Sequence, residues 1–452
     1  MSKNHTHSIN NDATPKLKPT LGPVMLWGLG VGYVISGMYF GWNLGLPEGG
    51  TLGLAIATGF VMLMYITFTL GYTELACAIP KAGGAFDYAT EGLGKRLGFL
   101  GGMAQLVEFL FAPPAIAFAI GAYVNIFFPS LPIIIIAIAA YIIFTLINIY
   151  GVKVAASFEL LITIVAVIEL LVFAGAALPS FEFENLSKNA LPNGYAGVFA
   201  AIPFAMWFFL AIEGIANVAE ETVNPQRNMI IGFGAAMATL VVLCILTFMA
   251  SVGVNGWETV VYDTNGEVSD SPLPLVIAQA VGKDHFLYGL VSAVGLFGLV
   301  ASFHGIILAA GRATFEFGRV SYIPKVFGKV HPKFATPANA LVLNTFIGIA
   351  ALLTGRTAEI ITIACFGALS LYIIAMLSLF ALRKNQPLKK RPFKVPFYPF
   401  VPAIALLIAS VALVAMTYYN TKLAMVYVTI LVVSYMYYYF WVEKKEKTWN
   451  NE

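Results

Sequence analysis

Long apolar segments restrict what this sequence can fold into more than any other feature. Twelve can be placed, separated by glycine, proline and charge clusters. Since about 17 to 25 apolar residues cross a hydrocarbon core of about 30 Å, each can span a bilayer as a helix. Hydrophobic residues fill 59% of the 452 positions and charged residues only 11%, which excludes a soluble globular protein and a disordered chain. The sequence therefore predicts an all-α membrane protein with twelve transmembrane helices.

The predicted spans fall into two groups of five, followed by two more. The first five are Val24–Leu46, Leu52–Ile79, Leu97–Phe128, Pro132–Tyr150 and Val154–Leu178. The others are Gly197–Glu220, Met229–Val254, Phe286–Phe315, Ala338–Thr354, Ile360–Leu382, Val401–Tyr419 and Leu423–Val442. We expect a tail over residues 1–20, a ten-helix core over 21–382, a basic loop over 383–398, helices 11 and 12 over 399–442, and a second tail over 443–452.

Basic residues are unevenly divided between the two sides of these spans. Of 26 Lys and Arg residues, 22 fall in the tails or after even-numbered spans; the other four are Lys188, Lys283, Arg356 and Lys422. Basic loops favour the cytoplasmic side of a membrane. We therefore expect both termini to be cytoplasmic and the protein to lie in the cytoplasmic (inner) membrane.

Charge, cysteine content and missing motifs exclude several functional classes. A formal net charge of +3 gives no basic field for nucleic acid. Cys77, Cys244 and Cys365 lie in apolar runs without a CxxC pair, so we expect small buried side chains rather than disulfides or zinc ligands. The chain has no HExxH helix, no phosphate-binding loop ending in Gly-Lys-Ser/Thr and no GxSxG turn. No catalytic residue, metal site or cofactor is predicted, and an enzyme is not expected.

Two spans contain residues that disfavour a continuous helix. The predicted break residues are Ser36, Gly37 and Gly41 in span 1, and Ala211, Ile212, Glu213 and Gly214 in span 6. Glycine costs about 1 kcal/mol inside a helix, and unwound backbone is tolerated in a membrane only where it lines a cavity or is buried in protein. Spans 1 and 6 correspond if spans 1–5 and 6–10 are repeats, which predicts a five-plus-five inverted-repeat transporter with broken helices 1 and 6. The alternative is that these glycines only allow close helix packing.

Five carboxylates lie within or near the ends of apolar spans, where ionisable groups are costly and often functional. Glu108 of span 3 and Glu213 of span 6 are predicted to face a central cavity, and Glu169 lies in the middle of span 5. A carboxylate in such a place can bind an ammonium group or carry a proton. For Glu74 and Glu159, near span ends and within reach of Lys81 or Lys153, we favour a structural role.

Two further side chains are candidates for the same cavity. His304 lies deep in span 8, where it can relay a proton, donate a hydrogen bond to substrate or simply pack between helices. Trp207 directly precedes the break in span 6 and offers an aromatic face to an organic cation.

Several motifs resemble the amino acid, polyamine and organocation transporter superfamily. The stretches similar to that superfamily are Glu74–Phe86, Val107–Leu110, Ala219–Glu221 with Asn224–Arg227, and Arg319–Pro337. Within the superfamily, Val34–Gly37, Tyr39–Asn43 and Pro113-Pro114 are most similar to ethanolamine permeases. The resemblance extends from about Gly22 to Val442. It implies a substrate site at the membrane midplane between spans 1, 3, 6, 8 and 10, with alternating access driven by an ion gradient.

Carried onto this chain, the resemblance implies backbone contacts from the span 1 break, a counter-charge from Glu108 and an aromatic wall from Trp207. The predicted substrate-binding residues are Ser36, Gly37, Met38, Tyr39, Glu108, Trp207, Phe208, Ala211, Glu213, His304, Phe366 and Tyr372. The predicted ion-coupling residues are Glu108, Glu169 and His304.

The chain departs from the superfamily pattern at two places. Met38 replaces a glycine common in the superfamily and the acidic residue frequent in ethanolamine permeases, which shifts the amine contact to Glu108 or Glu213. Some proton-coupled members of the superfamily carry a lysine within span 5, whereas no Lys or Arg lies between Lys153 and Lys188 in this chain. Coupling through such a lysine is therefore excluded, and we expect the coupling ion to be a proton or sodium.

We therefore predict a secondary active transporter importing ethanolamine or a similar small organic amine. An amino-acid transporter or exchanger of the same superfamily is the first alternative, because the partial positive charge of the helix ends at the two breaks can bind a carboxylate. A membrane sensor without flux and an ion channel are further alternatives. The expected partners are the amine, the coupling ion and the lipid bilayer.

Overall fold

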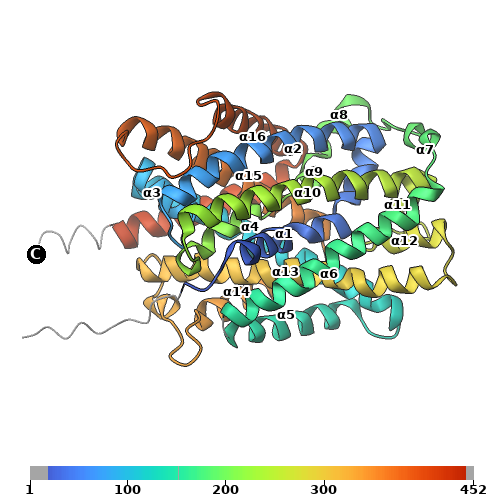
Figure 1. Ribbon diagram of the computed structural model, residues 1–452, viewed down its shortest axis with the longest axis horizontal. Helices are drawn as coiled ribbons and strands as arrows, with labels where there is room; N and C mark the ends of the chain where they lie inside the picture. The colour runs from blue at the N-terminus through green and yellow to red at the C-terminus, as the bar shows by residue number, and fades with distance from the viewer. Residues whose placement is uncertain (1–18, 151, 444–452) are drawn as a thin grey trace, which may run out of the picture.

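A computed structural model describes residues 19–150 and 152–443 of the chain, without the side chains of residues 152–156. These residues are almost entirely helical, and strand-like pairing among them is limited to two isolated bridges. Figure 1 shows most long helices side by side along a common direction. The predicted all-α fold is confirmed. Most of both predicted tails and the side chain of Lys153 lie outside the described residues.

The spans follow one another with few long connections. The first five are α1 (Pro23–Tyr39), α2 (Leu46–Ala78), α4 (Lys95–Phe127), α5 (Ile133–Tyr150) and α6 (Val152–Ala177). The sixth consists of α8 (Gly194–Ala200), α9 (Ile202–Trp207) and the 3₁₀ helix η3 (Ile212–Glu221). The others are α10 (Pro225–Asn255), α13 (Phe286–Arg319), α14 (Ala338–Leu352), α15 (Thr357–Asn385), α16 (Phe400–Tyr419), and α17 (Thr421–Tyr437), which continues as the π-helical η5 (Tyr438–Glu443).

Length and hydropathy support twelve spans. Ten helical segments in the described part of the chain are long and apolar enough to cross a membrane, and the shorter apolar helices α1 and α14 take the first and ninth positions. Short elements lie between the spans. They are η1 (Trp42–Gly45), α3 (Ala85–Leu93), η2 (Leu178–Ser180), α7 (Phe183–Ser187), α11 (Glu258–Val261), α12 (Pro272–Ala280) and η4 (Lys325–Gly328). Apolar periodicity identifies the spans but misses these short elements, because most are shorter than two helical turns.

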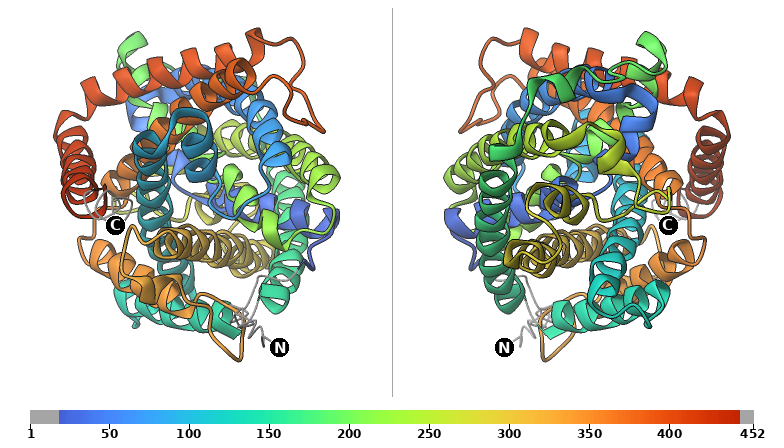
Figure 2. Two further views of the ribbon diagram at one scale, coloured as in Figure 1. Left: turned by 90° about the vertical axis from the view of Figure 1, so that its left-hand side faces the viewer. Right: turned by 90° about the vertical axis from the view of Figure 1, so that its right-hand side faces the viewer.

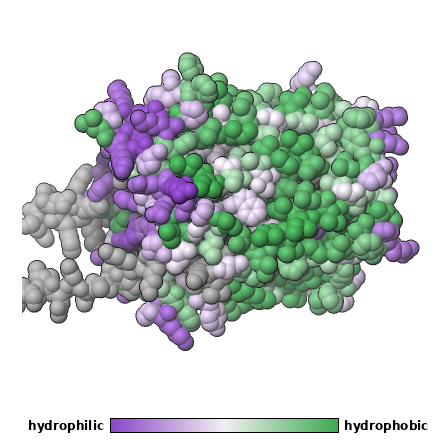
Figure 3. Space-filling model, viewed as in Figure 1, coloured by the Kyte–Doolittle hydropathy of each residue, from purple (hydrophilic) through white to green (hydrophobic). Residues whose placement is uncertain are grey.

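Burial divides the helices into a centre and a periphery. The sixth span is completely buried over its most apolar stretch, whereas only 17% of the corresponding stretch of α17 is buried. Helix α4 contacts α3, α5, α13 and α15, and α1 contacts α6, α10 and α13. Figure 3 shows a broad apolar band across the face in view, with hydrophilic residues gathered toward the two ends. An apolar outer surface of this kind is suited to contact with lipid rather than with water.

The two ends of the bundle differ in charge. The end that carries α3 and η5, here called the basic end, holds Arg96, Arg319, Arg383 and Lys389 in ion pairs. The opposite end, here called the loop end, carries α7, α11 and α12 (Figures 1 and 2). The three cysteines are buried and unpaired, as predicted.

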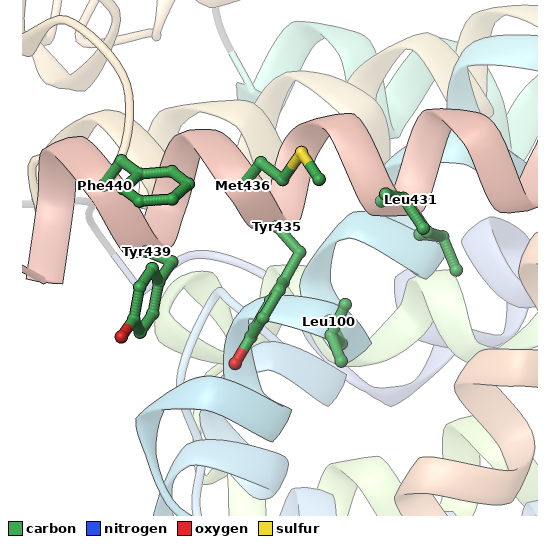
Figure 4. A pocket seen from close by; sticks show the side chains of 7 residues that line it. Leu100, Leu431, Tyr435, Met436, Tyr439 and Phe440 are labelled. Atoms are coloured by element: carbon green, nitrogen blue, oxygen red, sulfur yellow. The ribbon is translucent and has the colours of Figure 1, made fainter.

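An apolar groove of about 420 Å³ runs along the outside of the bundle between α4 and α17. In Figure 4 its side chains come from α17 and η5, apart from Leu100 of α4. They are Leu100, Leu431, Val432, Tyr435, Met436, Tyr439 and Phe440. The groove faces away from the buried centre and offers almost no polar surface.

Near the basic end, Arg312 of α13 and Glu221 of η3 form an ion pair of 2.9 Å between two fully buried side chains. Replacement of Glu221 by Ala leaves the guanidinium group buried without its partner, which costs about 3 to 5 kcal/mol. We expect a clearly lower thermal unfolding midpoint in detergent for E221A.

The matched control is Glu359→Ala, which opens the exposed Arg356–Glu359 pair. Exposed pairs contribute little to stability, so this variant should unfold at the wild-type temperature. Equal midpoints for the two variants would contradict a stabilising role of the buried pair.

Candidate functional site

The first span is interrupted directly after Tyr39. The residues of the predicted break that precede this point, Ser36 and Gly37, still belong to the regular helix α1. Phe40 is extended, and Gly41 has φ of 87°, in the left-handed region that favours glycine. The short helix η1 then leads into α2. The interruption thus lies at Phe40 and Gly41, one turn beyond the first residues of the predicted break.

The sixth span is interrupted in the same manner. Helix α9 ends at Trp207, Ala211 has a left-handed φ of 76°, and the chain continues as the 3₁₀ helix η3. A non-glycine residue in this conformation is uncommon and is held there by its surroundings. Ile212, Glu213 and Gly214 form the first turn of η3.

The two interruptions pack against each other. A Cβ atom at Gly37 would overlap the carbonyl oxygen of Trp207, and one at Gly41 would overlap its indole ring. The rings of Phe40 and Trp207 meet edge to face with centroids 5.5 Å apart. Close approach of backbone to backbone therefore requires glycine at position 37.

Several backbone amides at or near the two interruptions have partners inside the protein. The hydroxyl of Ser302 in α13 accepts from the amide of Ser36 at 2.8 Å. The side chain of Asn43 accepts from the amide of Gly41 at 3.0 Å. Further amides bonded to nearby carbonyl oxygens are those of Phe40, Phe209 and Gly214. Part of the interrupted backbone is thus satisfied by bonds within the protein, as a membrane requires.

Two carboxylates meet beside the sixth-span interruption. Glu108 of α4 and Glu213 of η3 are both fully buried, and their carboxyl groups are neighbours. The Tyr372 hydroxyl of α15 donates to Oε2 of Glu213 at 3.0 Å. The hydroxyl of Tyr65 in α2 lies 3.1 Å from that of Tyr372. We call Glu108, Glu213, Tyr372 and Tyr65 the central acidic site.

No basic side chain among the described residues balances this site. The titratable neighbours that interact with its carboxylates in the described part of the chain are tyrosines and Cys365, and none is Lys or Arg. Both carboxylate oxygens of Glu108 and the indole N–H of Trp207 have no hydrogen-bond partner among the described residues. An unpaired buried carboxylate requires a cation or a proton.

The other predicted residues lie in separate places. His304 bonds to Glu159, and the Tyr39 hydroxyl donates to Glu169. The ring of Phe366 stacks on that of Tyr427 in α17 at 5.6 Å, and that of Phe208 stacks on Trp42 at 5.4 Å. Of the predicted substrate-binding residues, Glu108, Ala211, Glu213 and Tyr372 form one cluster, with Trp207 close to the same interruption.

The structure also identifies the partners of the two carboxylates assigned a structural role. Glu74 is ion-paired as expected, but with Arg383 and Arg391 rather than with Lys81, which lies 3.9 Å from Asp87. Glu159 does not reach toward the membrane surface, because its carboxylate is completely buried. Its hydrogen bond to His304 joins two groups that are far apart in the sequence.

Tyr65 and Ser302 are functional candidates that the sequence alone did not single out. A tyrosine or serine in an apolar span carries no charge signal, and each gains its place only from the partner that the fold brings to it. Tyr65 lies far from Tyr372 and Ser302 far from Ser36 in the sequence, although each pair is in hydrogen-bond contact.

The loop between α11 and α12 (residues 262–271), here called the strap, lies next to the first-span interruption at the loop end. The Asn43 side chain donates to the carbonyl of Ser269 at 2.9 Å, and the hydroxyl of Thr357 at the start of α15 donates to Asp270 at 3.4 Å. Burial raises the pKa of Asp270 to about 6. Burial of Asp270 is thus favoured when its carboxyl group is protonated.

The sequence of this chain matches a known protein family over almost its whole length. The family model described as "Amino acid permease" matches residues 24–452. This chain belongs to the amino acid permease family. As a permease it is a transporter and not an enzyme, and it acts on a small organic substrate in a lipid bilayer.

Three curated relatives illustrate the range of substrates. The chain is 27% identical to a methylthioribose transporter of Bacillus subtilis, over 86% of both chains. It is 26% identical to the branched-chain amino acid permease BcaP of the same species, again over 86% of both. It is also 26% identical to the low-affinity putrescine importer PlaP of Escherichia coli, over 88% of this chain and 90% of the relative.

Gly37 offers a test of the contact between the two interruptions in this permease. Gly37→Ala places a methyl group against the Trp207 carbonyl, so we expect loss of substrate binding together with a lower unfolding midpoint. Equilibrium binding and thermal unfolding in detergent measure both effects. Gly234→Ala is the control, because open space surrounds that position in α10. Substrate affinity and an unfolding midpoint equal to those of the wild type in G37A would contradict the close approach of the two spans.

The strap provides a test based on pH. A carboxyl whose pKa is raised by folding stabilises the folded state when it is protonated, and this contribution is lost as the pH rises through about 6. We expect Asp270→Asn to slow proteolysis of the strap at neutral pH and to remove the pH dependence near 6.

Asp263 of the same loop is the control, because its pKa is shifted in the opposite direction. Backbone N–H groups of Glu267 and Asn265 lower the pKa of Asp263. Asp263→Asn should therefore speed cleavage at neutral pH. A strap in D270N that is cleaved at the wild-type rate across the whole pH range would contradict the role of Asp270.

Proposed function

We propose that this permease is a secondary active transporter that imports ethanolamine or a similar small organic amine, coupled to a proton or sodium gradient. In this proposal it works in the cytoplasmic membrane with both termini cytoplasmic. The basic end then faces the cytoplasm, as expected from the positive-inside rule.

The central acidic site carries the proposal. Glu108 and Glu213 are fully buried neighbours without a Lys or Arg partner among the described residues. Two carboxylates in contact in a low dielectric cannot both be ionised without a cation between or beside them. An ammonium group supplies that cation and donates up to three hydrogen bonds. The oxygens of Glu108 and the Oε1 atom of Glu213 accept no other hydrogen bond in the described part of the chain.

Aromatic side chains complete the fit to an amine. Tyr65 contacts Phe209 and Tyr372, with ring centroids 5.4 and 5.3 Å apart. Trp207 lies at the end of α9, in contact with both interruptions. Aromatic faces attract organic cations by about 0.5 to 2 kcal/mol each. The indole N–H of Trp207 and the tyrosine hydroxyls can bond to a hydroxyl such as that of ethanolamine.

The same geometry favours an amine over an amino acid. A substrate carboxylate requires free backbone amides at helix ends. The amides of Ser36, Gly41 and Gly214 are instead bonded within the protein. At these three positions a substrate carboxylate would have to replace an existing hydrogen bond, whereas an amine would not.

The relatives support both readings at the level of the family. One relative is named a putrescine importer and another a branched-chain amino acid permease. Putrescine is an amine without a carboxylate, so recognition of that chemistry occurs within this family. The amino-acid alternative is therefore tested together with the amine, by comparing amines and amino acids as substrates.

Flux measurements test the proposal directly. The purified permease in proteoliposomes should exchange internal for external labelled ethanolamine, and should bind choline, alanine and arginine more weakly. Selective exchange of an amino acid would overturn the amine assignment. Binding without exchange or accumulation would overturn transport and favour a sensor.

Substitutions test the site itself. Glu108→Gln removes one charge from the pair, so we expect a strong loss of ethanolamine binding. Trp207→Ala should weaken binding by about 1 to 3 kcal/mol, as is typical of a desolvated aromatic contact. Isothermal titration in detergent measures both.

The control is Glu267→Gln, which removes a carboxylate from the exposed loop-end surface. It should bind the amine like the wild type. Unchanged affinity in both E108Q and W207A would place the amine elsewhere in the protein.

A further inference from the structure

A second pair of titratable groups is buried in the permease, apart from the central acidic site. Nδ1 of His304 in α13 lies 2.8 Å from Oε2 of Glu159 in α6, and both side chains are fully buried. The other carboxylate oxygen and Nε2 of the imidazole have no hydrogen-bond partner among the described residues. The proposed amine contacts use neither residue.

The pair lies where α1, α6 and α13 meet. Cβ atoms at Gly32 of α1 and at Gly305 of α13 would overlap or crowd the free oxygen of Glu159, so the carboxylate fills the gap between these two helices. From α5, the Asn148 side chain donates to the carbonyl of His304 at 3.1 Å. The rings of Phe144 and Phe158 flank the imidazole.

Few charged or titratable groups surround the pair in the described part of the chain. Tyr33 of α1 has a hydroxyl without a hydrogen-bond partner and interacts electrostatically with Glu159. Beyond it, Arg312 of α13 and Glu221 of η3 are bonded to each other. Among the side chains that the structure describes, no Lys or Arg is bonded to Glu159, whereas Glu74 is bonded to arginine.

Contacts connect this pair to the substrate site through Tyr33. One edge of the Tyr33 ring contacts Gly305 and the other edge contacts Gly214, the residue that follows Glu213 in η3. The ring therefore lies between α13, which carries His304, and the interrupted sixth span, which carries a carboxylate of the central acidic site. A change of charge at Glu159 acts on the same helices that enclose the amine.

We propose that Glu159 and His304 together form the proton-coupling site of this permease, which narrows the coupling ion of the proposed function to a proton. With one proton the pair is neutral overall, as carboxylic acid and imidazole or as carboxylate and imidazolium. Without that proton it carries one negative charge. One proton taken from the side of higher proton concentration is released on the other side in each transport cycle, so charge and atoms balance.

The chemistry of the pair fits this role. Histidine is the side chain whose ordinary titration range lies nearest physiological pH, and two groups in hydrogen-bond contact titrate as a unit. A neutral pair is tolerated in the closed, dry state, whereas a lone negative charge favours exposure to water. Protonation therefore favours closure of the transporter around the amine.

Uptake into proteoliposomes with an alkaline interior tests the proposal. A weak base that permeates passively gathers on the acidic side, so amine accumulation inside such vesicles requires coupling to proton entry. We expect the wild type to accumulate labelled ethanolamine under this gradient without sodium. Linked sites typically change each other's affinity by about 5- to 150-fold, and Glu159→Gln should abolish this effect of protons on amine affinity.

Exchange of internal for external amine separates this proposal from the proposed function. Exchange needs no net proton movement, so we expect E159Q and H304Q to retain it while losing gradient-driven accumulation. Absence of exchange in the wild type would refute amine transport itself. Exchange in the wild type together with accumulation driven only by sodium would refute the proton site alone.

A rival site is tested in parallel. Glu169 of the same helix bonds to the Tyr39 hydroxyl, and loss of accumulation in E169Q with full accumulation in E159Q would overturn the proposal. If E159Q does not fold, the pH dependence of amine affinity in the wild type and in H304Q still tests the proposal. Proton-independent amine affinity in the wild type, or unchanged pH dependence in H304Q, would exclude the pair as the coupling site.

Discussion

The contact between the interrupted first and sixth spans is the constraint on which the rest of the structure depends. Unwound backbone survives in a membrane only where protein satisfies its polar groups. Here Gly37 and Gly41 let the first span approach Trp207, and the side chains of Ser302 and Asn43 bond the amides at the first interruption. Once these two spans are held together, the surrounding helices have a fixed centre to pack against, and the carboxylates of the third and sixth spans become neighbours.

Buried charge is handled in three different ways within this one fold. Glu74 and Glu221 are balanced by arginines near the basic end. Glu108 and Glu213 are neighbours without a fixed cation among the described residues, so a proton or another cation must balance the pair. Glu159 is paired with a side chain that can itself gain or lose a proton. The carboxylates paired with arginine stabilise the fold. The Glu108–Glu213 and Glu159–His304 pairs are suited to binding and releasing a cation or a proton.

Much of the architecture was predictable from the sequence, because a bilayer imposes a length and an apolar composition on every span. Twelve spans and their order are confirmed, and so is the interruption of the sixth span at Ala211. The first interruption was expected to include Ser36 and Gly37, but these stay helical because the extended residue is Phe40. Glycine marks where a helix can approach a neighbour as well as where it can unwind, and sequence alone does not separate the two.

Tyr33 is held between Gly214 and Gly305, with one edge of its ring against each. The side-chain volumes at these three positions, which lie on three different helices, therefore constrain one another. During divergence, a side chain larger than glycine at either of the outer two positions can be accommodated only when the residue at position 33 becomes smaller. Relatives that share this packing should therefore show correlated substitutions at these three positions, even though positions 33 and 214 are 181 residues apart and positions 214 and 305 are 91 residues apart. Contact in the folded protein accounts for a correlation over such distances.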